Sequence, residues 1–294
     1  MKTKKSFIFL ILIGLVYSCS NSDEEHNYSG EDGNEEIILV KKINTIWNNR
    51  YLYSQTNGTT NINFYADGNS KVEYTYEDSK IVRIDWNVTY SNYSPYNPGS
   101  SDSGHSIQRF TYTNDLITYC KYIRLNQIKE YTFEYDAQKR VSKVIYAYNQ
   151  DSNQNHSILI SYISNNQITV NAIGGYYDGQ IYNIQLVGGN VIYLGNKNFE
   201  YDTKNHIFKN IKGFDQYLFG MLALAQAESP MLSYFDNPFW FLYSNGNNNI
   251  TSTNITGTTL DITYSYNTEN YPISAYEITT NGTVPAETTI EYYE

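Results

Sequence analysis

Apolar and polar residues alternate with a period of two along most of the chain from residue 37 onward. This alternation is typical of β-strands that bury one face. We therefore expect strands over residues 37–46, 61–65, 71–76 and 80–89, with a short helix as the alternative for the first of these ranges. Asp67-Gly68 predicts a hairpin turn between the second and third of these strands, because an Asp-Gly pair fits the twist of adjoining strands. Residues 91–106 carry prolines and glycines and are predicted to form a loop.

Six stretches of the sequence share one plan. In each, alternating aromatic residues end in Tyr-Asp, Tyr-Asn or a similar pair, a short polar turn follows, and a second alternating run returns. The stretches are residues 72–84, 108–123, 131–146, 160–170, 198–211 and 262–277. One such hairpin cannot bury its face alone, so repeated units are expected to stack. The sequence predicts a mainly β fold, a long curved antiparallel meander with Tyr, Ile and Val ladders across neighbouring strands.

One segment breaks the strand rhythm. In residues 213–231, GFDQYLFGMLALAQAESPM, apolar side chains recur at helical spacing, and Ser229-Pro230 ends the run. We expect one short helix over about residues 214–227, packed on the concave side of the meander. The alternative is that this helix covers a cavity, as in half-barrel carriers of apolar ligands.

The first residues of the chain predict export. Lys2, Lys4 and Lys5 form a positively charged region, and Phe7 to Val16 is an apolar run of the length found in secretory signals. That run is too short to cross roughly 30 Å of hydrocarbon as a permanent helix. We therefore expect residues 1–18 to be a signal peptide that is removed.

The end of this signal resembles the lipobox of bacterial lipoproteins. Val16-Tyr17-Ser18-Cys19 stands where such proteins are cut before a lipid-bearing cysteine. The resemblance implies that Cys19 carries the lipid and that two or three acyl chains anchor the protein. The acidic stretch that follows resembles the export signal of Bacteroidota lipoproteins sent to the outer face of the outer membrane; its residues are Ser22, Asp23, Glu24 and Glu25. The alternative is a tether that is acidic only to stay solvated.

The net charge of the chain limits the classes of molecule that it can bind. The net charge of −10 becomes −13 when residues 1–18, with their three lysines, are removed. An acidic chain of this kind argues against nucleic acid as a partner, because binding to phosphates needs clustered Lys and Arg.

Residues 19–36 are predicted to be an acidic disordered tether, and residues 37–294 a single β domain. Cys120 is the second of two cysteines and is expected to be a small buried apolar residue.

The repeats resemble a known group of proteins. Phe133-Glu134-Tyr135-Asp136 and Phe199-Glu200-Tyr201-Asp202 are similar to Tyr-Asp repeats of the Rhs type. The chain from residue 37 to 294 resembles Bacteroidota lipoproteins that carry degenerate Tyr-Asp hairpins. That resemblance implies a β-hairpin fold and brings no assigned activity.

The sequence holds no recognisable catalytic or metal-binding set. Its four histidines, His26, His105, His156 and His206, are far apart, and no Gly-rich phosphate loop or nucleophile motif is present. We assign no catalytic residue, metal or cofactor. The densest aromatic cluster contains Phe239, Trp240, Phe241 and Tyr243, which are candidates for stacking on a sugar ring or a partner protein, or for core packing.

These observations favour a lipid-anchored outer-membrane protein, exposed at the cell surface or facing the periplasm, with a binding or structural role. A glycan or another envelope protein is the favoured partner, besides the membrane reached through the lipid on Cys19. One alternative is a polysaccharide-processing hydrolase, which needs two acids facing each other in a cleft. The other is the carrier of an apolar ligand.

Overall fold

The computed structural model describes residues 37–57, 60–91, 101–195, 197–228, 246–255, 258–279 and 286–293. The chain divides into two units, residues 1–36 and residues 37–294, and all described residues belong to the second. The described elements are β1 (Val40–Asn57), β2 (Thr60–Glu77), β3 (Lys80–Ser91), β4 (Ser101–Thr113), β5 (Leu116–Arg124), β6 (Gln127–Tyr135), β7 (Val141–Tyr148), η1 (Ser152–Gln154), β8 (His156–Tyr162), β9 (Gln167–Ile173), η2 (Gly175–Tyr177), β10 (Ile181–Val187), β11 (Asn190–Leu194), β12 (Lys197–Tyr201), α1 (Phe214–Glu228), β13 (Ile250–Ile255), β14 (Thr258–Tyr266), β15 (Pro272–Thr279) and β16 (Ala286–Tyr292).

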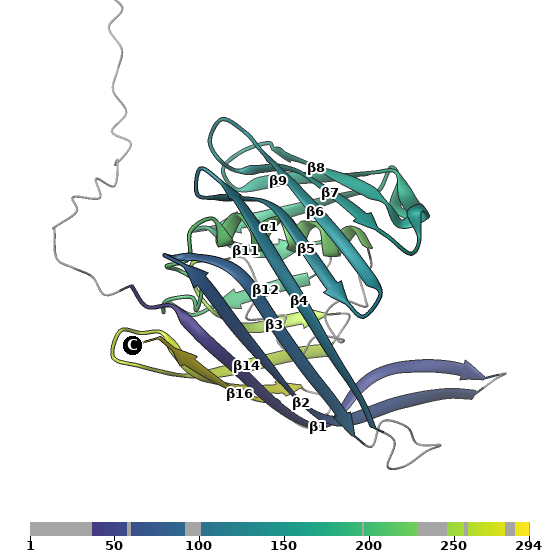
Figure 1. The fold of residues 1–294 in the computed structure, drawn as a ribbon, viewed down its shortest axis with the longest axis vertical. Helices are drawn as coiled ribbons and strands as arrows, with labels where there is room; N and C mark the ends of the chain where they lie inside the picture. The colour runs from purple at the N-terminus through teal and green to yellow at the C-terminus, as the bar shows by residue number, and fades with distance from the viewer. Residues whose placement is uncertain are drawn as a thin grey trace, which may run out of the picture. The chain divides into compact units, whose positions relative to one another are not determined.

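The sixteen strands form a closed antiparallel barrel in which each strand pairs with its neighbours in sequence (Figure 1). The predicted mainly β meander with one helix is confirmed, but the expectation of an open, curved sheet is wrong. β1 pairs with β16, from Val40 opposite Tyr292 to Trp47 opposite Ala286. Closure removes the two edge strands, whose unpaired backbone groups an open sheet would expose. Alternation within single strands carries no signal for this pairing between the two ends of the domain.

Five of the six similar stretches form hairpins, at the β2–β3, β4–β5, β6–β7, β8–β9 and β14–β15 turns. The stretch 198–211 does not return as a strand after β12. The predicted loop over residues 91–106 is wrong for Ser91, which ends β3, and for residues 101–106, which begin β4. Residues 92–100 lie outside the described part of the chain. The predicted helix is confirmed as α1.

The predicted turn at Asp67-Gly68 is wrong. Both residues lie inside the continuous strand β2, where Gly68 is opposite Trp47 of β1 and Tyr90 of β3. A Cβ atom on Gly68 would lie 2.5 Å from Cζ2 of Trp47, closer than van der Waals contact permits. The glycine at this position therefore makes room for the buried indole of Trp47. A glycine within an alternating sequence can thus mark a close approach of another group to the backbone of a strand, and not only a turn.

The helix α1 lies in the interior of the barrel, where it contacts the strands β5, β7 and β8 of the wall (Figure 1). Leu218, Phe219, Ala223 and Leu224 are all 3% exposed or less. Successive helical positions point about 100° apart, so burial at these four residues means that the helix is enclosed on several sides. It packs against Phe110 of β4 and Phe133 of β6 through Tyr217, whose ring centroid lies 5.1 and 5.4 Å from theirs.

Residues 202–213, which we call the crossing segment, lead from β12 to α1 along one end of the barrel. Their hydrogen bonds reach successive parts of that end: Asn205 N donates to Asn270 O (3.1 Å), Asn210 Nδ2 to Ile38 O (3.2 Å) and Lys212 N to Ser79 O (3.0 Å). The segment thus joins the β14–β15 turn, the start of β1 and the β2–β3 turn. Gly213, with φ of 68°, then turns the chain into the helix beside Asp115.

Seven tyrosines in the described strands share one contact at this end of the barrel. Each lies near the end of an even-numbered strand, and its hydroxyl donates to the carbonyl oxygen of a residue near the start of the preceding strand. The pairs are Tyr76 to Val40, Tyr112 to Ile81, Tyr135 to Ile117, Tyr162 to Val141, Tyr201 to Val191, Tyr264 to Ile250 and Tyr292 to Pro272, at 2.6 to 3.1 Å. We call this set the tyrosine ring. It links every hairpin to the next except at β10.

The exception at β10 has a chemical reason. Leu186 is opposite Val191 of β11, as Tyr135 is opposite Val141 of β7, and in both strands the register shifts by one residue just before this position. A register shift of this kind is a β-bulge, which re-aims the side chain that follows it. Leucine has no hydroxyl, so Leu186 packs against the core without the hydrogen bond.

We predict that Tyr135→Phe lowers the free energy of unfolding by about 0.5–1.5 kcal/mol, the net value of one intramolecular hydrogen bond. The substitution keeps the ring and removes the hydroxyl that lies 2.6 Å from the Ile117 carbonyl oxygen. Urea unfolding followed by circular dichroism measures the change. The matched control is Tyr276→Phe on β15, an outward tyrosine that is 37% exposed, where we expect a change of about 0.5 kcal/mol or less. Equal losses in the two variants would contradict a stabilising role for the ring.

Candidate functional site

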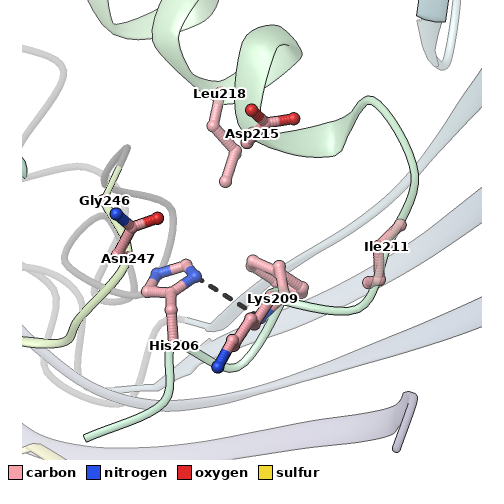
Figure 2. A pocket seen from close by; sticks show the side chains of 8 residues that line it. His206, Lys209, Ile211, Asp215, Leu218, Gly246 and Asn247 are labelled. Atoms are coloured by element: carbon pink, nitrogen blue, oxygen red, sulfur yellow. Dashed lines mark hydrogen bonds between the residues drawn. The ribbon is translucent and has the colours of Figure 1, made fainter. Parts of the chain in front are cut away.

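A pocket of about 140 Å³ lies between the crossing segment, the first turns of α1 and the residues before β13 (Figure 2). The crossing segment contributes two charged or titratable side chains, His206 and Lys209, and the helix contributes Asp215. The remaining lining residues are Phe208, Ile211, Leu218, Gly246 and Asn247. The lining of the pocket therefore combines three apolar side chains with an imidazole, an ammonium, a carboxylate and an amide.

Local hydrogen bonds hold the polar groups of this pocket. The backbone N–H of Phe208 donates to Nδ1 of His206 (3.4 Å). The same ring meets Phe208 edge to face at 5.6 Å. Lys209 Nζ donates to Asn205 Oδ1 (2.9 Å), and Gln216 Nε2 donates to Asp215 Oδ2 (3.1 Å). Asp215 also lies in the first turn of the helix, where a negative charge is favourable.

The pocket does not supply the chemistry that a glycoside hydrolase needs. Such an enzyme uses two carboxyl groups on either side of the scissile bond, and Asp215 is the one carboxylate among the eight lining residues. The volume of the pocket, about 140 Å³, is also below the roughly 300 Å³ at which pockets for small ligands begin. The arrangement has room for ordered water or one small polar group.

The described contact between α1 and the barrel wall is filled by side chains. A Cβ atom on Gly220 would lie 2.9 Å from the Phe133 ring and 3.2 Å from Val144. Phe219 packs near Tyr162, with ring centroids 6.3 Å apart. Over these residues the helix fits the wall too closely to leave space for an apolar ligand.

Polar side chains are also buried inside the barrel. Thr45 of β1 and Thr288 of β16 are opposite each other, with their hydroxyl oxygens 2.6 Å apart. Lys197 of β12 and Glu277 of β15 are buried as well. Burial lowers the pKa of Lys197 to about 8. The interior is therefore apolar around α1 and contains hydroxyl and charged groups elsewhere.

The outer face of the barrel is mainly polar, with single exposed apolar residues such as Ile46, Leu159, Ile181 and Ile278 among the polar ones. On β16, Ala286, Thr288 and Ile290 are buried, and the residues between them, Glu287 and Thr289, are exposed. The same alternation holds on β9, where Ile168, Val170 and Ala172 are buried while Thr169 and Asn171 lie on the other face. Strands that cross a membrane as a barrel show the opposite pattern, with apolar residues facing out toward lipid.

The structure places the sequence-derived candidates as follows. Cys19, the acidic export signal Ser22, Asp23, Glu24 and Glu25, and the aromatic cluster Phe239, Trp240, Phe241 and Tyr243 all lie outside the described residues. His105, His156 and His206 lie on β4, on β8 and in the crossing segment. Within the described ranges, no group of three His, Cys, Asp or Glu side chains is arranged to hold a metal ion.

Cys120 is buried, as expected from its alternating strand context. Its Sγ lies 3.8 Å from the hydroxyl of Tyr217 on α1. Burial raises the pKa of the thiol to about 12, so the thiolate that would act as a nucleophile is not formed at neutral pH.

No protein-family model matches this chain, and no curated protein matches it either. Among solved structures, a porin-like protein from Bacteroides uniformis is similar, with 10% sequence identity and a TM-score of 0.40 over 86% of this chain and 96% of that chain. A porin-like protein from Bacteroides vulgatus matches with 8% identity and a TM-score of 0.22 over 87% of this chain and 99% of that chain. Among the described residues, no helix combines the length and the apolar character needed to span a membrane.

Proposed function

We propose that this protein is an outer-membrane lipoprotein, anchored by lipid on Cys19, whose barrel stands in water and acts by binding a glycan or another envelope protein. The observation that carries the proposal is the polar outer face of the barrel. Outward positions hold charged residues both in the middle of a strand, as at Lys121 on β5, and nearer its ends, as at Lys143 on β7 and Glu287 on β16. A lysine or arginine facing lipid at mid-membrane costs about 2–4 kcal/mol, so a face of this composition belongs in water.

The anchor follows from the first residues of the chain. A barrel that stands in water needs another means of staying at the membrane, and the lipobox-like sequence before Cys19 provides one. Two or three acyl chains hold a protein stably where one chain would be reversible. The acidic stretch from Ser22 to Glu25 directs the protein to the cell surface in this proposal.

Binding is favoured over the two other functions because of what the described interior contains. A hydrolase needs a second acid facing Asp215, and the pocket lining does not provide it. A carrier needs space beside α1, and Phe133 and Val144 fill that space at Gly220. The broad outer face, with its Thr, Asn, Tyr and charged side chains, remains as the surface available to a partner.

We also propose that the chain belongs with the Bacteroidota lipoproteins that carry degenerate Tyr-Asp hairpins. The support is the common role of the repeat tyrosines, exemplified by Tyr135 and Tyr201, whose hydroxyls bind carbonyl oxygens of the preceding strand. Asp136, which follows Tyr135, accepts hydrogen bonds from the backbone N–H groups of Gln138 and Arg140 (both 2.9 Å) and so shapes the turn. In such a pair, the tyrosine links its hairpin to the preceding one, and the aspartate stabilises the turn of its own hairpin.

Protease shaving of intact cells tests the surface location. We expect added protease to digest the barrel while a periplasmic marker protein survives. In the matched variant, Asp23, Glu24 and Glu25 are replaced by alanine, and the protein is expected to stay anchored but become protected. A wild-type protein that survives shaving untouched would contradict surface exposure.

A further inference from the structure

Three cations lie side by side on the outer face of this acidic protein. Arg83 of β3 is directly opposite Arg109 of β4, and Arg109 is directly opposite Lys121 of β5. The residues next to them in sequence, Ile84, Phe110 and Cys120, are buried, so the three charged side chains point outward. We call these three residues the basic row; its strands run side by side in one wall of the barrel (Figure 1).

The basic row works against the stability of the sheet. Like charges directly opposite each other on neighbouring strands repel, and opposite charges there would be favourable. The chain has 30 acidic residues and only 20 Lys and Arg, so a row of three adjacent cations does not follow from composition. A feature that costs stability and runs against the net charge points to a role in binding.

The two ends of the row are neutralised, and its centre is not. Arg83 donates through Nε and Nη2 to the two carboxylate oxygens of Asp85, both at 2.6 Å. Lys121 Nζ lies 3.6 Å from Oε1 of Glu130. Arg109 is exposed and forms no ion pair within the described residues. Its guanidinium is therefore available to an outside anion.

The surroundings of the row suit a sugar chain. Ile107 and Thr111 lie on the same face of β4, two residues on either side of Arg109, and Tyr119 lies on that face of β5. The Tyr119 hydroxyl donates to Glu130, and burial, together with this hydrogen bond, raises the pKa of Tyr119 to about 12. The ring therefore stays neutral and fixed, and aromatic and aliphatic surface of this kind packs against the apolar faces of sugar rings.

Resting on the proposed binding role at the envelope, we propose that the basic row binds an acidic polysaccharide, one that carries carboxylate or sulfate groups along its chain. The fork of N–H donors on a guanidinium matches the oxygens of such groups in a bidentate contact. Adjacent strands are about 4.8 Å apart, so the row is about 10 Å wide, close to the screening length of about 8 Å at physiological salt. A single acidic group placed on the row interacts mainly with Arg109, because Asp85 and Glu130 already neutralise the two ends of the row.

The same distances disfavour an anionic membrane as the partner. A charged bilayer is an extended plane that meets a whole side of the barrel at once, and the protein carries a net charge of −10, which becomes −13 without residues 1–18. That net charge repels the plane, while screening confines the attraction of the row to its immediate neighbourhood. A flexible polymer avoids this repulsion because it places only a few groups near the protein.

The test uses the lipidated full-length protein in phosphatidylcholine nanodiscs, with polygalacturonate, dextran sulfate, neutral dextran and phosphatidylglycerol vesicles as probes. We expect at least one of the two acidic polymers to bind, with affinity that falls as salt rises, and neutral dextran and the vesicles to bind far more weakly. Arg109→Thr should weaken polymer binding about tenfold or more, the value of one charged hydrogen-bonded contact, and Arg109→Lys should retain part of the affinity.

The matched control is Lys71→Thr on β2, which changes the net charge by the same amount. Lys71 lies outside the row, where it pairs with Glu73 at 2.6 Å, so polymer binding should not change. Arg109→Thr should also unfold at the same or a higher urea concentration than the wild type, because it removes repulsion. The proposal is overturned if neither acidic polymer binds, if the two threonine variants lose affinity equally, or if the vesicles bind as well as the polymers. None of these results depends on where the protein is located in the cell, so they leave the proposed anchoring to its own test.

Discussion

Replacing Phe214 by alanine should lower the free energy of unfolding by about 3–5 kcal/mol, the range found when a large aromatic side chain is removed from a core. Phe214 is 0% exposed and begins the helix inside the barrel. Its ring centroid lies 4.9 Å from that of Phe208, 5.2 Å from that of Tyr217 and 6.0 Å from that of Phe110. It therefore connects the crossing segment, the helix and the wall.

The loss is expected to fall at the upper part of this range because the site is enclosed. A closed wall of paired strands cannot move inward easily to fill the space that the ring leaves, and unfilled space adds to the cost. Urea unfolding followed by tyrosine and tryptophan fluorescence measures the change. Lys212→Ala, two residues earlier at an exposed position, is the control and should change stability by about 0.5 kcal/mol or less. If Phe214→Ala unfolds at the urea concentration of the control, the helix does not hold the barrel together.

The elements of this fold were predictable where short-range patterns determine them. The helix from Phe214 to Glu228 follows from helical spacing, and the β4–β5 turn follows from Asn114-Asp115, two residues that tolerate the positive φ angles found there. The closure of the barrel was not predictable in this way. It depends on pairing between β1 and β16, whose residues lie more than 200 positions apart, and an alternating strand pattern is the same at an edge as in a closed wall.

Two errors have a common origin in reading a residue from its sequence neighbours alone. Asp67-Gly68 looks like a turn, but the glycine is needed under Trp47, which is twenty-one residues earlier in the chain and adjacent in space. The stretch after Tyr201-Asp202 looks like another hairpin, but it becomes the crossing segment. There, Asp202 accepts hydrogen bonds from the backbone N–H groups of Lys204 (3.0 Å) and Asn249 (3.1 Å) instead of closing a two-strand turn.

The candidate sites were less predictable than the fold. The pocket brings His206 and Asp215 together with Asn247, and no sequence motif links segments so far apart. The basic row depends on the register of three strands, because a shift of one residue would turn each side chain to the other face. The repeat tyrosines were visible in the sequence, but their spacing gave no reason to expect that each hydroxyl would bind the preceding strand.

The second large effect is expected at Cys19. A serine at this position cannot carry a thioether-linked lipid, and with the lipid the protein loses the part that holds it at the membrane. We predict that the Cys19→Ser chain, exported behind a signal peptide that an ordinary signal peptidase removes, moves almost completely from the membrane fraction to the water-soluble fraction. Its circular dichroism spectrum and urea midpoint should equal those of the lipidated protein, because the barrel does not depend on lipid for its core.

The most direct test of the account is therefore the fractionation of this Cys19→Ser protein, without detergent and after a carbonate wash of the membranes. If the polar outer face stands in water, the protein is recovered folded in the supernatant while the wild type stays in the membrane pellet. If the Cys19→Ser protein remains in the washed outer membrane as a folded barrel, the strands themselves are embedded in lipid and the account is wrong.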